Sequence, residues 1–283
     1  MNKFHEGSLI YPLNLSLNVM DMDLMTRFYK DSLGLEILEK KNDFVDLGVD
    51  GRRILTLVRP ENVTQKPPRR TGLYHFAILL PTRKHLGSFI NHMRDANVPV
   101  TGGADHEVSE ALYLQDPEDN GIEVYADIPD SKWEWDGGQV QMGTDPLDFR
   151  GLMELGRDTP WTGMPEGTRL GHMHLHVGDL EEAYRFYGLM GFKRVAQLAG
   201  SANFISTGGY HHHIGLNVWN GRGAKPAPEN ATGLRHYTLA APDSEALEKI
   251  FESLQGQNYQ AEMEDGVLFT KDPSGNRIQI IIP

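Results

Sequence analysis

The chain of 283 residues is 39% hydrophobic and 23% charged, a composition typical of a globular protein, and no apolar run approaches the roughly 18 residues that a membrane span needs. It contains no cysteine, which excludes disulfide bonds and Cys-ligated metals, so any metal must be held by His, Asp or Glu. The net charge of −12 argues against nucleic acid or an anionic membrane as a partner. The first residues show no basic head followed by an apolar stretch, so we expect no secretory signal and a cytoplasmic location.

The sequence repeats itself, and the first repeat begins near the N-terminus. Residues 13–38 reappear as residues 173–195. Each segment starts with alternating apolar and polar residues, which is typical of a strand. An acidic residue, a helical run that carries Phe-Tyr and a glycine then follow, and this order predicts a capped helix and its end.

A second pair of segments matches in the same way. Residues 72–100 parallel residues 233–261, and each segment predicts a strand, a helix and a further strand. Residues 112–127 and 268–282 then share the sequence Asp-Pro-x-x-Asn, which predicts a turn between two strands. The nearly constant offset between matching segments indicates duplication of a two-part unit.

The chain therefore consists of four similar units, each with a strand, a helix and about three more strands. They cover residues 9–60, 72–127, 170–220 and 233–283. The segment between the second and third unit is rich in Gly, Pro, Asp and Trp, which is typical of a connection. We predict one domain over residues 1–128 from the first two units, a linker over 129–168, and a second domain over 169–283.

Paired βαβββ units with an Asp-Pro turn before the last strand resemble the vicinal oxygen chelate superfamily, which includes glyoxalase I, the bleomycin-resistance proteins and the extradiol ring-cleaving dioxygenases. The resemblance covers all four units. It implies an α+β fold in which units pair edge to edge into cupped mixed sheets. It also implies a divalent metal at the centre of a cup, with ligands on the first and last strand of a unit.

The residues at these implied metal positions differ between the units. On the first strands, the four units carry Asn14, His75, His172 and His236. On the last strands, six residues after the turn proline, the second unit carries Glu123 and the fourth carries Gln279. A Gln amide has no charge to hold a dication, so only the second unit offers both a His and a carboxylate.

The third ligand depends on which unit pairs with the second unit. Pairing with the third unit gives His75, His172 and Glu123, the two-His, one-carboxylate set of non-heme Fe(II) oxygenases, and the same donors also fit Mn(II). Fused four-unit glyoxalases of this superfamily pair their middle units, so we prefer this arrangement. Two alternatives stay open: His236 is the ligand if the third and fourth units form the site, and His174 is the competitor on the strand of His172.

Candidate catalytic residues follow from the same resemblance. Extradiol dioxygenases carry a His in an H-x-[LI]-[AG]-[FL] pattern, which here selects His212 as the acid–base residue. They also carry a Tyr four residues before the turn proline and a His upstream of it. These positions are Tyr113 and His106, which are expected to hydrogen-bond the developing oxyanion.

The resemblance implies an extradiol dioxygenase similar to the catechol 2,3-dioxygenases, an oxidoreductase of aromatic hydrocarbon catabolism. Its partners would be a catecholic substrate and O2, and its product a 2-hydroxymuconic semialdehyde. Edge strands of such units often pair between copies, so we expect a homo-oligomer. The alternatives are a metal-dependent lyase of the glyoxalase I type and a non-catalytic, ligand-sequestering protein of the bleomycin-resistance kind.

Overall fold

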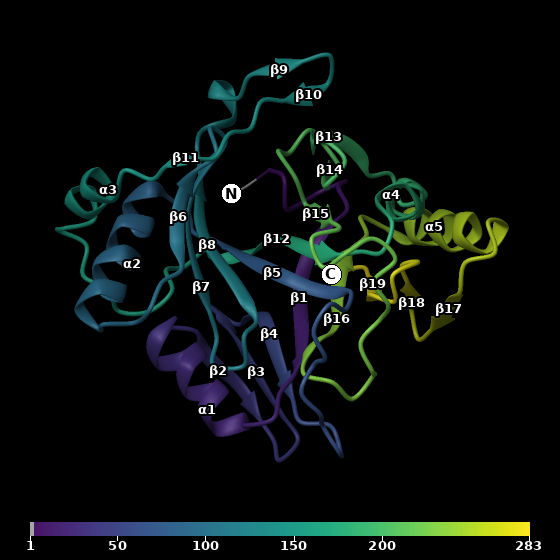
Figure 1. The fold of residues 1–283 in the computed structure, drawn as a ribbon, viewed down its shortest axis with the longest axis horizontal. Helices are drawn as coiled ribbons and strands as arrows, with labels where there is room; N and C mark the ends of the chain where they lie inside the picture. Colours follow the sequence, from purple (N-terminus) through teal and green to yellow (C-terminus); the bar gives the residue numbers. More distant parts are fainter. Residues whose placement is uncertain (1–2) are drawn as a thin grey trace.

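The computed structural model describes residues 3–283 and contains the four predicted βαβββ units (Figure 1). The first unit comprises β1 (Tyr11–Asn18), α1 (Met22–Arg27) with a following π turn (Phe28–Ser32), β2 (Glu36–Lys40), β3 (Phe44–Val49) and β4 (Arg52–Val58). The second comprises β5 (Gly72–Leu79), α2 (Arg83–Asp95), β6 (Gly102–Asp105), β7 (Ser109–Gln115) and β8 (Gly121–Asp127). The third comprises β12 (Arg169–His176), α4 (Leu180–Gly188), β13 (Lys193–Leu198), β14 (Ala202–Ser206) and β15 (Ile214–Asn217). The fourth comprises β16 (Gly233–Ala240), α5 (Ser244–Gly256), β17 (Ala261–Glu264), β18 (Val267–Lys271) and β19 (Arg277–Ile281).

The connection between the second and third units has short elements of its own. These are a 3₁₀ turn (Asp130–Lys132), β9 (Trp135–Asp136), β10 (Gln139–Val140), β11 (Asp145–Pro146) and α3 (Phe149–Leu155). β9 and β10 form a small hairpin that projects beyond the sheets (Figure 1), while β11 pairs with β6 at the edge of the second unit. The connection is therefore part of the structure around the second unit as well as a tether.

The units pair across the two halves of the chain. β5 runs antiparallel to β12, which joins the second and third units in a nine-stranded sheet of order β11-β6-β7-β8-β5-β12-β15-β14-β13. β1 runs antiparallel to β16, which joins the first and fourth units in an eight-stranded sheet of order β17-β18-β19-β16-β1-β4-β3-β2. The preferred pairing of the middle units is confirmed. The alternative pairing of the third and fourth units is wrong, because the fourth unit belongs to the other sheet.

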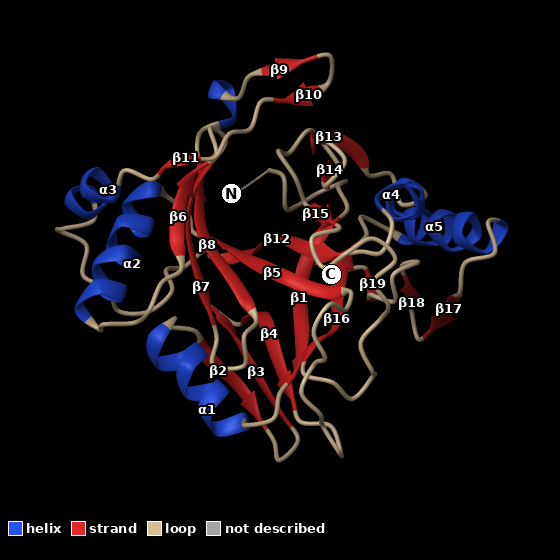
Figure 2. Cartoon of the chain, in the orientation of Figure 1, coloured by secondary structure: helices blue, strands red, loops and turns tan. Residues whose placement is uncertain are grey.

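The two sheets share one hydrophobic core, and the helices lie on the outside (Figure 2). Strand alternation separates the two faces of β12: Met173 and Leu175 are buried in the core, while His172 and His174 point to the opposite face. The fold therefore builds a polar, concave face on the same strands that supply the core. Both predictions of fold class, an α+β fold and cupped mixed sheets, are confirmed.

The repeated Phe-Tyr and Asp-Pro motifs meet in space. Tyr29 of the first unit donates a hydrogen bond of 2.6 Å to Asp116 in the turn of the second unit. Tyr187 of the third unit lies 3.1 Å from Asp272 in the turn of the fourth. Both tyrosines are fully buried, so each hydroxyl needs a partner, and the turn carboxylate supplies it. This pairing explains why the two motifs recur together along the chain.

Among residues 3–283, none of the helices combines the length and the apolar character needed to cross a membrane.

Candidate metal centre

The three predicted ligands are brought together by the register of three neighbouring strands. Ala77 of β5 pairs with Glu123 of β8 on one side and with His172 of β12 on the other. His75 lies two residues before Ala77 and so projects from the same face of β5. Because the side chain at the centre of this row is only a methyl group, the imidazoles and the carboxylate can converge above it.

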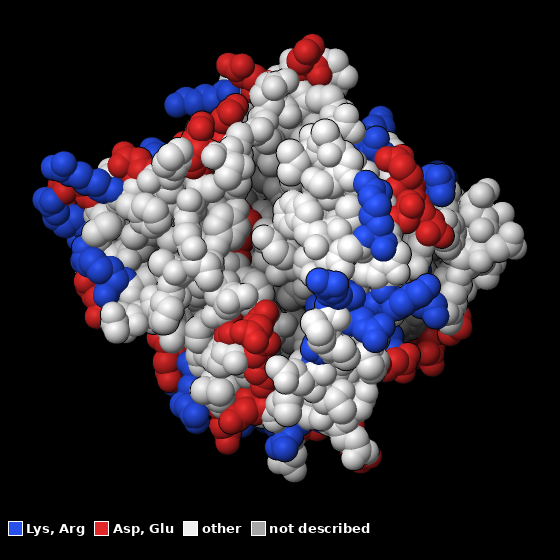
Figure 3. Space-filling model, viewed as in Figure 1, with Lys and Arg blue, Asp and Glu red and all other residues white. Residues whose placement is uncertain are grey.

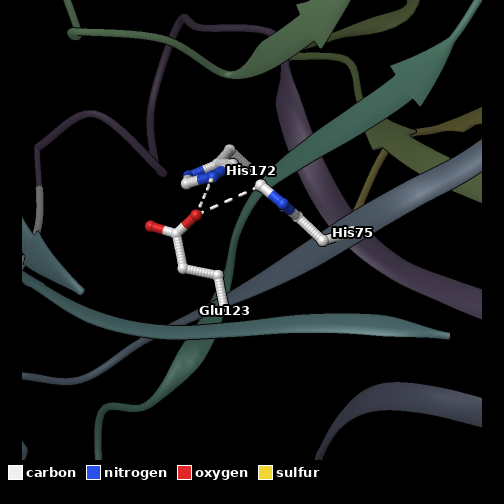
Figure 4. A group of neighbouring side chains, drawn as sticks. All are labelled: His75, Glu123 and His172. Carbon is white, nitrogen blue, oxygen red and sulfur yellow. Dashed lines mark hydrogen bonds and ion pairs between the residues drawn. The ribbon is translucent and has the colours of Figure 1, made fainter. Parts of the chain in front are cut away.

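The donor atoms of these three residues lie close enough together to bind the same metal ion (Figure 4). Glu123 Oε2 is 3.1 Å from His75 Nε2 and 3.3 Å from His172 Nε2, and the donor atoms of the three residues all lie within 4.8 Å of one another. The exposed fractions are 7% for His75, 3% for Glu123 and 1% for His172. Within residues 3–283, these three residues form the group of His, Asp or Glu side chains whose donor atoms lie close enough together to hold one metal ion.

The protonation states of the trio suit metal binding. Burial raises the pKa of Glu123, but the adjacent imidazoles of His172 and His75 outweigh this effect and hold the pKa well below its usual value. Burial lowers the pKa of His172 to about 4, against an opposing effect of the Glu123 charge. At neutral pH the carboxylate is ionised and the His172 imidazole is neutral, and these are the forms that coordinate a metal.

One contact within the trio also points to a cation-binding site. His75 Nε2 is buried and close to the carboxylate, but its angle to Glu123 is not that of a hydrogen bond, so the nitrogen has no partner. An ionised, buried carboxylate between two imidazoles, one of which has a buried nitrogen without a hydrogen-bond partner, is a donor set that a divalent cation would complete. The residues present therefore fit a divalent metal bound by two imidazoles and one carboxylate.

No fourth ligand comes from the third unit at the position that matches Glu123. In the third unit, the residue that corresponds to Glu123 is Gly215 of β15. Gly215 pairs with His174 of β12 in the same way as Glu123 pairs with Ala77 of β5 in the second unit. A Cβ atom on Gly215 would lie 2.8 Å from the His174 ring, so glycine is what allows this ring to pack there. The side of the trio that faces the third unit consequently carries no carboxylate at this place.

His174, the competing ligand, lies beside the trio but outside it. It pairs with His75 across the two strands, and their ring centroids are 4.9 Å apart. Its Nε2 is buried without a hydrogen-bond partner. It is not part of the group with metal-binding geometry, which uses His172 from this strand. His236, the other alternative, lies on β16 in the other sheet.

Tyr113 and His106 form a hydrogen-bonded pair next to Glu123. Tyr113 of β7 pairs with Glu123 of β8, and its hydroxyl lies 2.6 Å from His106 Nε2. His106 Nδ1 lies 2.8 Å from the carbonyl oxygen of Gly143, which can only accept, so Nδ1 carries the proton and Nε2 accepts from Tyr113. Burial and the Glu123 charge raise the pKa of Tyr113 well above its usual value, so the hydroxyl keeps its proton.

His212 lies two residues before the start of β15 at Ile214. It is therefore free of strict strand alternation, and its ring lies 4.1 Å from the ring of His172 between centroids. Burial and the neighbouring imidazoles of His172 and His211 hold the pKa of His212 well below its usual value, so it is a neutral ring near pH 7. The structure thus brings all six predicted site residues to one place.

These residues open into a cavity of about 480 Å³, which is lined by His75, Glu123, His106, Tyr113 and His212 together with residues that the sequence analysis did not select. The latter include Tyr74, Phe204, Trp219, Leu198 and the segment 139–144 of the connection, and His174, the competing ligand, lines the cavity as well. Among the described residues that line it, Glu123 is the single Asp or Glu and none is Lys or Arg. Figure 3 shows the corresponding hollow near the centre of the view, surrounded mainly by uncharged surface.

Comparison with known proteins agrees with the fold. The family model of the Glyoxalase/Bleomycin resistance protein/Dioxygenase superfamily matches residues 12–124 and 169–280, and the chain belongs to this superfamily. It is 42% identical over 288 aligned positions to a catechol-2,3-dioxygenase of Bacillus subtilis (strain 168), with 100% of each chain covered. The sequence-based expectation of an enzyme that resembles the catechol 2,3-dioxygenases is therefore confirmed.

Solved structures with the same fold have more distant sequences. Glyoxalase I from Zea mays superposes with a TM-score of 0.61 at 15% identity, over 96% of this chain and 92% of that one. The cppA protein from Streptococcus pneumoniae TIGR4 superposes with a TM-score of 0.57 at 13% identity, over 98% of this chain and 100% of that one. At such identities the likeness shows the fold alone.

Proposed function

We propose that this chain is an extradiol ring-cleaving dioxygenase that inserts O2 into a catechol-type aromatic diol at a non-heme Fe(II). The observation that carries the proposal is the convergence of His75, His172 and Glu123 in a cavity that also holds His212 and Tyr113. Two imidazoles and one carboxylate leave the remaining metal positions open, as in non-heme Fe(II) oxygenases. The full-length similarity to a catechol-2,3-dioxygenase supports the same reaction class. Mn(II) fits the same donors, so the metal itself must be measured.

A metal bound to this trio would supply positions for the two adjacent substrate oxygens and for O2, and would lower the pKa of a coordinated hydroxyl. His212 then accepts the hydroxyl proton and returns it after the ring has been attacked. Tyr113 turns its hydrogen bond from the neutral Nε2 of His106 to the substrate oxygen, because a developing oxyanion is the stronger acceptor. Cleavage beside the diol gives a 2-hydroxymuconic semialdehyde, as in the catabolism of aromatic compounds.

The lining of the cavity favours uncharged catechols. Phe204, Trp219 and Leu198 offer apolar surface for the ring and its substituents. The described lining residues include no Lys or Arg to pair with a carboxylate on the substrate, and Glu123 adds a negative charge. Catechol and alkylcatechols should therefore be turned over in preference to catechols that carry a carboxylate.

The two alternatives fit the site less well. A lyase of the glyoxalase I type requires carboxylate ligands from both paired units, and the position that matches Glu123 is Gly215. A ligand-sequestering protein has no need of a buried carboxylate between two imidazoles. An extradiol dioxygenase would use all of these residues, because the two imidazoles and the carboxylate bind its metal and Gly215 leaves metal positions open.

The test is reconstitution of the protein with Fe(II) under argon, followed by addition of catechol and then air. The proposal predicts uptake of one O2 per catechol and a yellow ring-fission product, with parallel reconstitution by Mn(II) identifying the active metal. Activity on a glutathione hemithioacetal alone would favour the lyase. Absence of both metal binding and turnover with simple catechols would favour the sequestering protein.

We also propose that the protein is cytoplasmic and forms a homo-oligomer. The sheets end in β2, β17, β11 and β13, and such edges are available for pairing with another copy. Sedimentation equilibrium would give the mass of the assembly, and a monomer at micromolar concentration would contradict the second proposal.

A further inference from the structure

A chain of three hydrogen-bonding groups leads away from the cavity behind His212. His212 Nδ1 lies 2.8 Å from His211 Nδ1. On the far side of the His211 ring, Nε2 lies 3.0 Å from Asp127 Oδ1. His211 is fully buried, and Asp127 is the last residue of β8, four residues after Glu123 and on the same face of that strand.

The direction of the hydrogen bonds in this chain is set by its carboxylate end. An ionised carboxylate only accepts, so the proton of His211 lies on Nε2 and points to Asp127. With that proton on Nε2, Nδ1 of His211 has the lone pair of the ring and accepts from His212. His212 therefore carries its proton on Nδ1, and its Nε2 presents a lone pair to the cavity.

The opposite arrangement is not self-consistent. With the proton of His211 on Nδ1, Nε2 and the Asp127 oxygen would be two acceptors facing each other at 3.0 Å in a buried place. His212 would then accept at Nδ1 and carry its proton on Nε2. A ring in that form cannot take a proton from a substrate hydroxyl in the cavity.

The carboxylate that sets this order is itself held in place. The hydroxyl of Tyr210 lies 3.0 Å from Asp127 Oδ1 and 2.7 Å from the hydroxyl of Tyr125. The ring of Trp133 from the connection packs against His211 with 5.2 Å between centroids. The hydrogen-bond chain thus belongs to a packed cluster that joins the last strand of the second unit to the segment before β15.

We infer that Asp127 and His211 are positioning residues that fix the tautomer and orientation of His212, so that its Nε2 is the nitrogen that accepts the substrate proton. This inference rests on the role of His212 in the proposed function. The arrangement is the one by which the carboxylate of a Ser-His-Asp triad orients its histidine, extended here by one imidazole. The class of ligand it serves is a hydroxyl that must lose its proton in the cavity.

The direct test reads the tautomers in the metal-free protein, so it does not depend on turnover. The protein is labelled with ¹⁵N-histidine, and long-range ¹H–¹⁵N spectra near neutral pH are assigned with single substitutions at His211 and His212. The expected forms are Nε2–H for His211 and Nδ1–H for His212. An Nε2–H form of His212 would overturn the inference, whatever the activity of the enzyme.

The kinetic test uses Asp127→Asn, because an amide can donate as well as accept and so permits the reversed order. We expect kcat with catechol to fall at least about 100-fold, while KM and the bound iron per chain change less than about twofold; the equivalent change in a Ser-His-Asp triad lowers kcat by about 10⁴-fold. Asp127→Glu, which keeps an acceptor, should recover part of the loss. Unchanged kcat in Asp127→Asn would overturn the inference.

The matched control is His213→Gln on the same buried segment. His213 Nε2 lies 2.8 Å from the carbonyl oxygen of Phe4 and takes no part in the chain to Asp127, and a Gln amide can make the same donation. Its kcat should stay within about threefold of the natural protein, and an equal loss in both variants would contradict a specific role of Asp127. If Asp127→Asn does not fold, the tautomers of the unsubstituted protein still decide. An inactive protein with the expected tautomers would refute the proposed function alone.

Discussion

Replacement of Glu123 by Gln tests the metal centre sharply, since it removes one charge and almost no volume. The carboxylate is 3% exposed, and its Oε2 lies 3.1 and 3.3 Å from the two imidazole nitrogens. It is the only anionic donor of the trio. Loss of a residue that merely supports a metal ligand weakens affinity by about 10–100-fold, so loss of this ligand should weaken Fe(II) binding more than about 100-fold. That corresponds to at least about 2.7 kcal/mol.

The assay is thermal unfolding with and without metal. A metal present at a hundred times its Kd stabilises the folded state by about 2.7 kcal/mol. For a chain of this size we expect the Tm of the natural protein to rise by roughly 4–5 °C. Glu123→Gln should show no such rise at the same Fe(II) concentration, while its metal-free Tm should fall, because the lowered pKa of Glu123 means that the ionised carboxylate stabilises the folded state at neutral pH.

Glu110→Gln is the matched control. Glu110 is also 3% exposed, but it pairs with Arg83 on the outer part of the second unit and contributes nothing to the trio. Its metal-free Tm should fall, because Arg83 loses its partner, and the rise with Fe(II) should persist. An equal rise with Fe(II) in Glu123→Gln, or no rise in the natural protein with either Fe(II) or Mn(II), would refute the assignment of the centre.

Further predictions address the catalytic groups and the fold around them. His212→Ala should retain iron but lose about 10²–10⁴-fold in kcat, measured as O2 uptake, and normal turnover would remove it from the acid–base role. Tyr113→Phe should lower kcat by about 10²-fold or more with little change in KM, and a kcat within twofold of normal would contradict the oxyanion role. Gly215→Ala places a Cβ atom 2.8 Å from the His174 ring and should cost about 1–3 kcal/mol in the free energy of unfolding, which urea titration measures. Burial and neighbouring arginines lower the pKa of His236 from 6.5 to about 4, so the folded state binds fewer protons than the unfolded chain in this interval and stability falls as the pH drops through it. His236→Asn should reduce the decrease in the free energy of unfolding between pH 6.5 and 4 by up to about 3 kcal/mol. An unaltered pH dependence of urea unfolding would show that His236 is not the group responsible.

Much of the fold was predictable because its signals are local and repeated. The Asp-Pro-x-x-Asn turns and the Phe-Tyr helices recur at a nearly constant offset, and each marks a fixed place within a unit. The structure adds the reason, since Tyr29 and Tyr187 hydrogen-bond the turn carboxylates of the neighbouring units. The pairing of the middle units was expected from the resemblance to fused four-unit glyoxalases, and the ligands at the positions that this resemblance implies agreed with it, because pairing with the third unit gives His75 and Glu123 a second imidazole.

The residues around the site were harder to predict from the sequence. Asp127 and His211 are 84 positions apart, and no local pattern connects a carboxylate at the end of one strand to a histidine before another. The cavity wall formed by residues 139–144 comes from a connection whose strands are two residues long, too short to show any periodicity. Histidine spacing alone did not decide between His172 and His174, because both project from the same face of β12 and only the three-dimensional register separates them.

The central claim is that one metal is held by His75, His172 and Glu123 with its remaining positions open. A crystal structure of the Fe(II)-loaded protein, with anomalous diffraction recorded at the iron edge, tests it most directly. The account predicts one anomalous peak whose nearest protein atoms are Nε2 of the two histidines and a carboxylate oxygen of Glu123. A peak on His174 or His236 in place of one of them, or a fourth protein ligand on the open side, would contradict it.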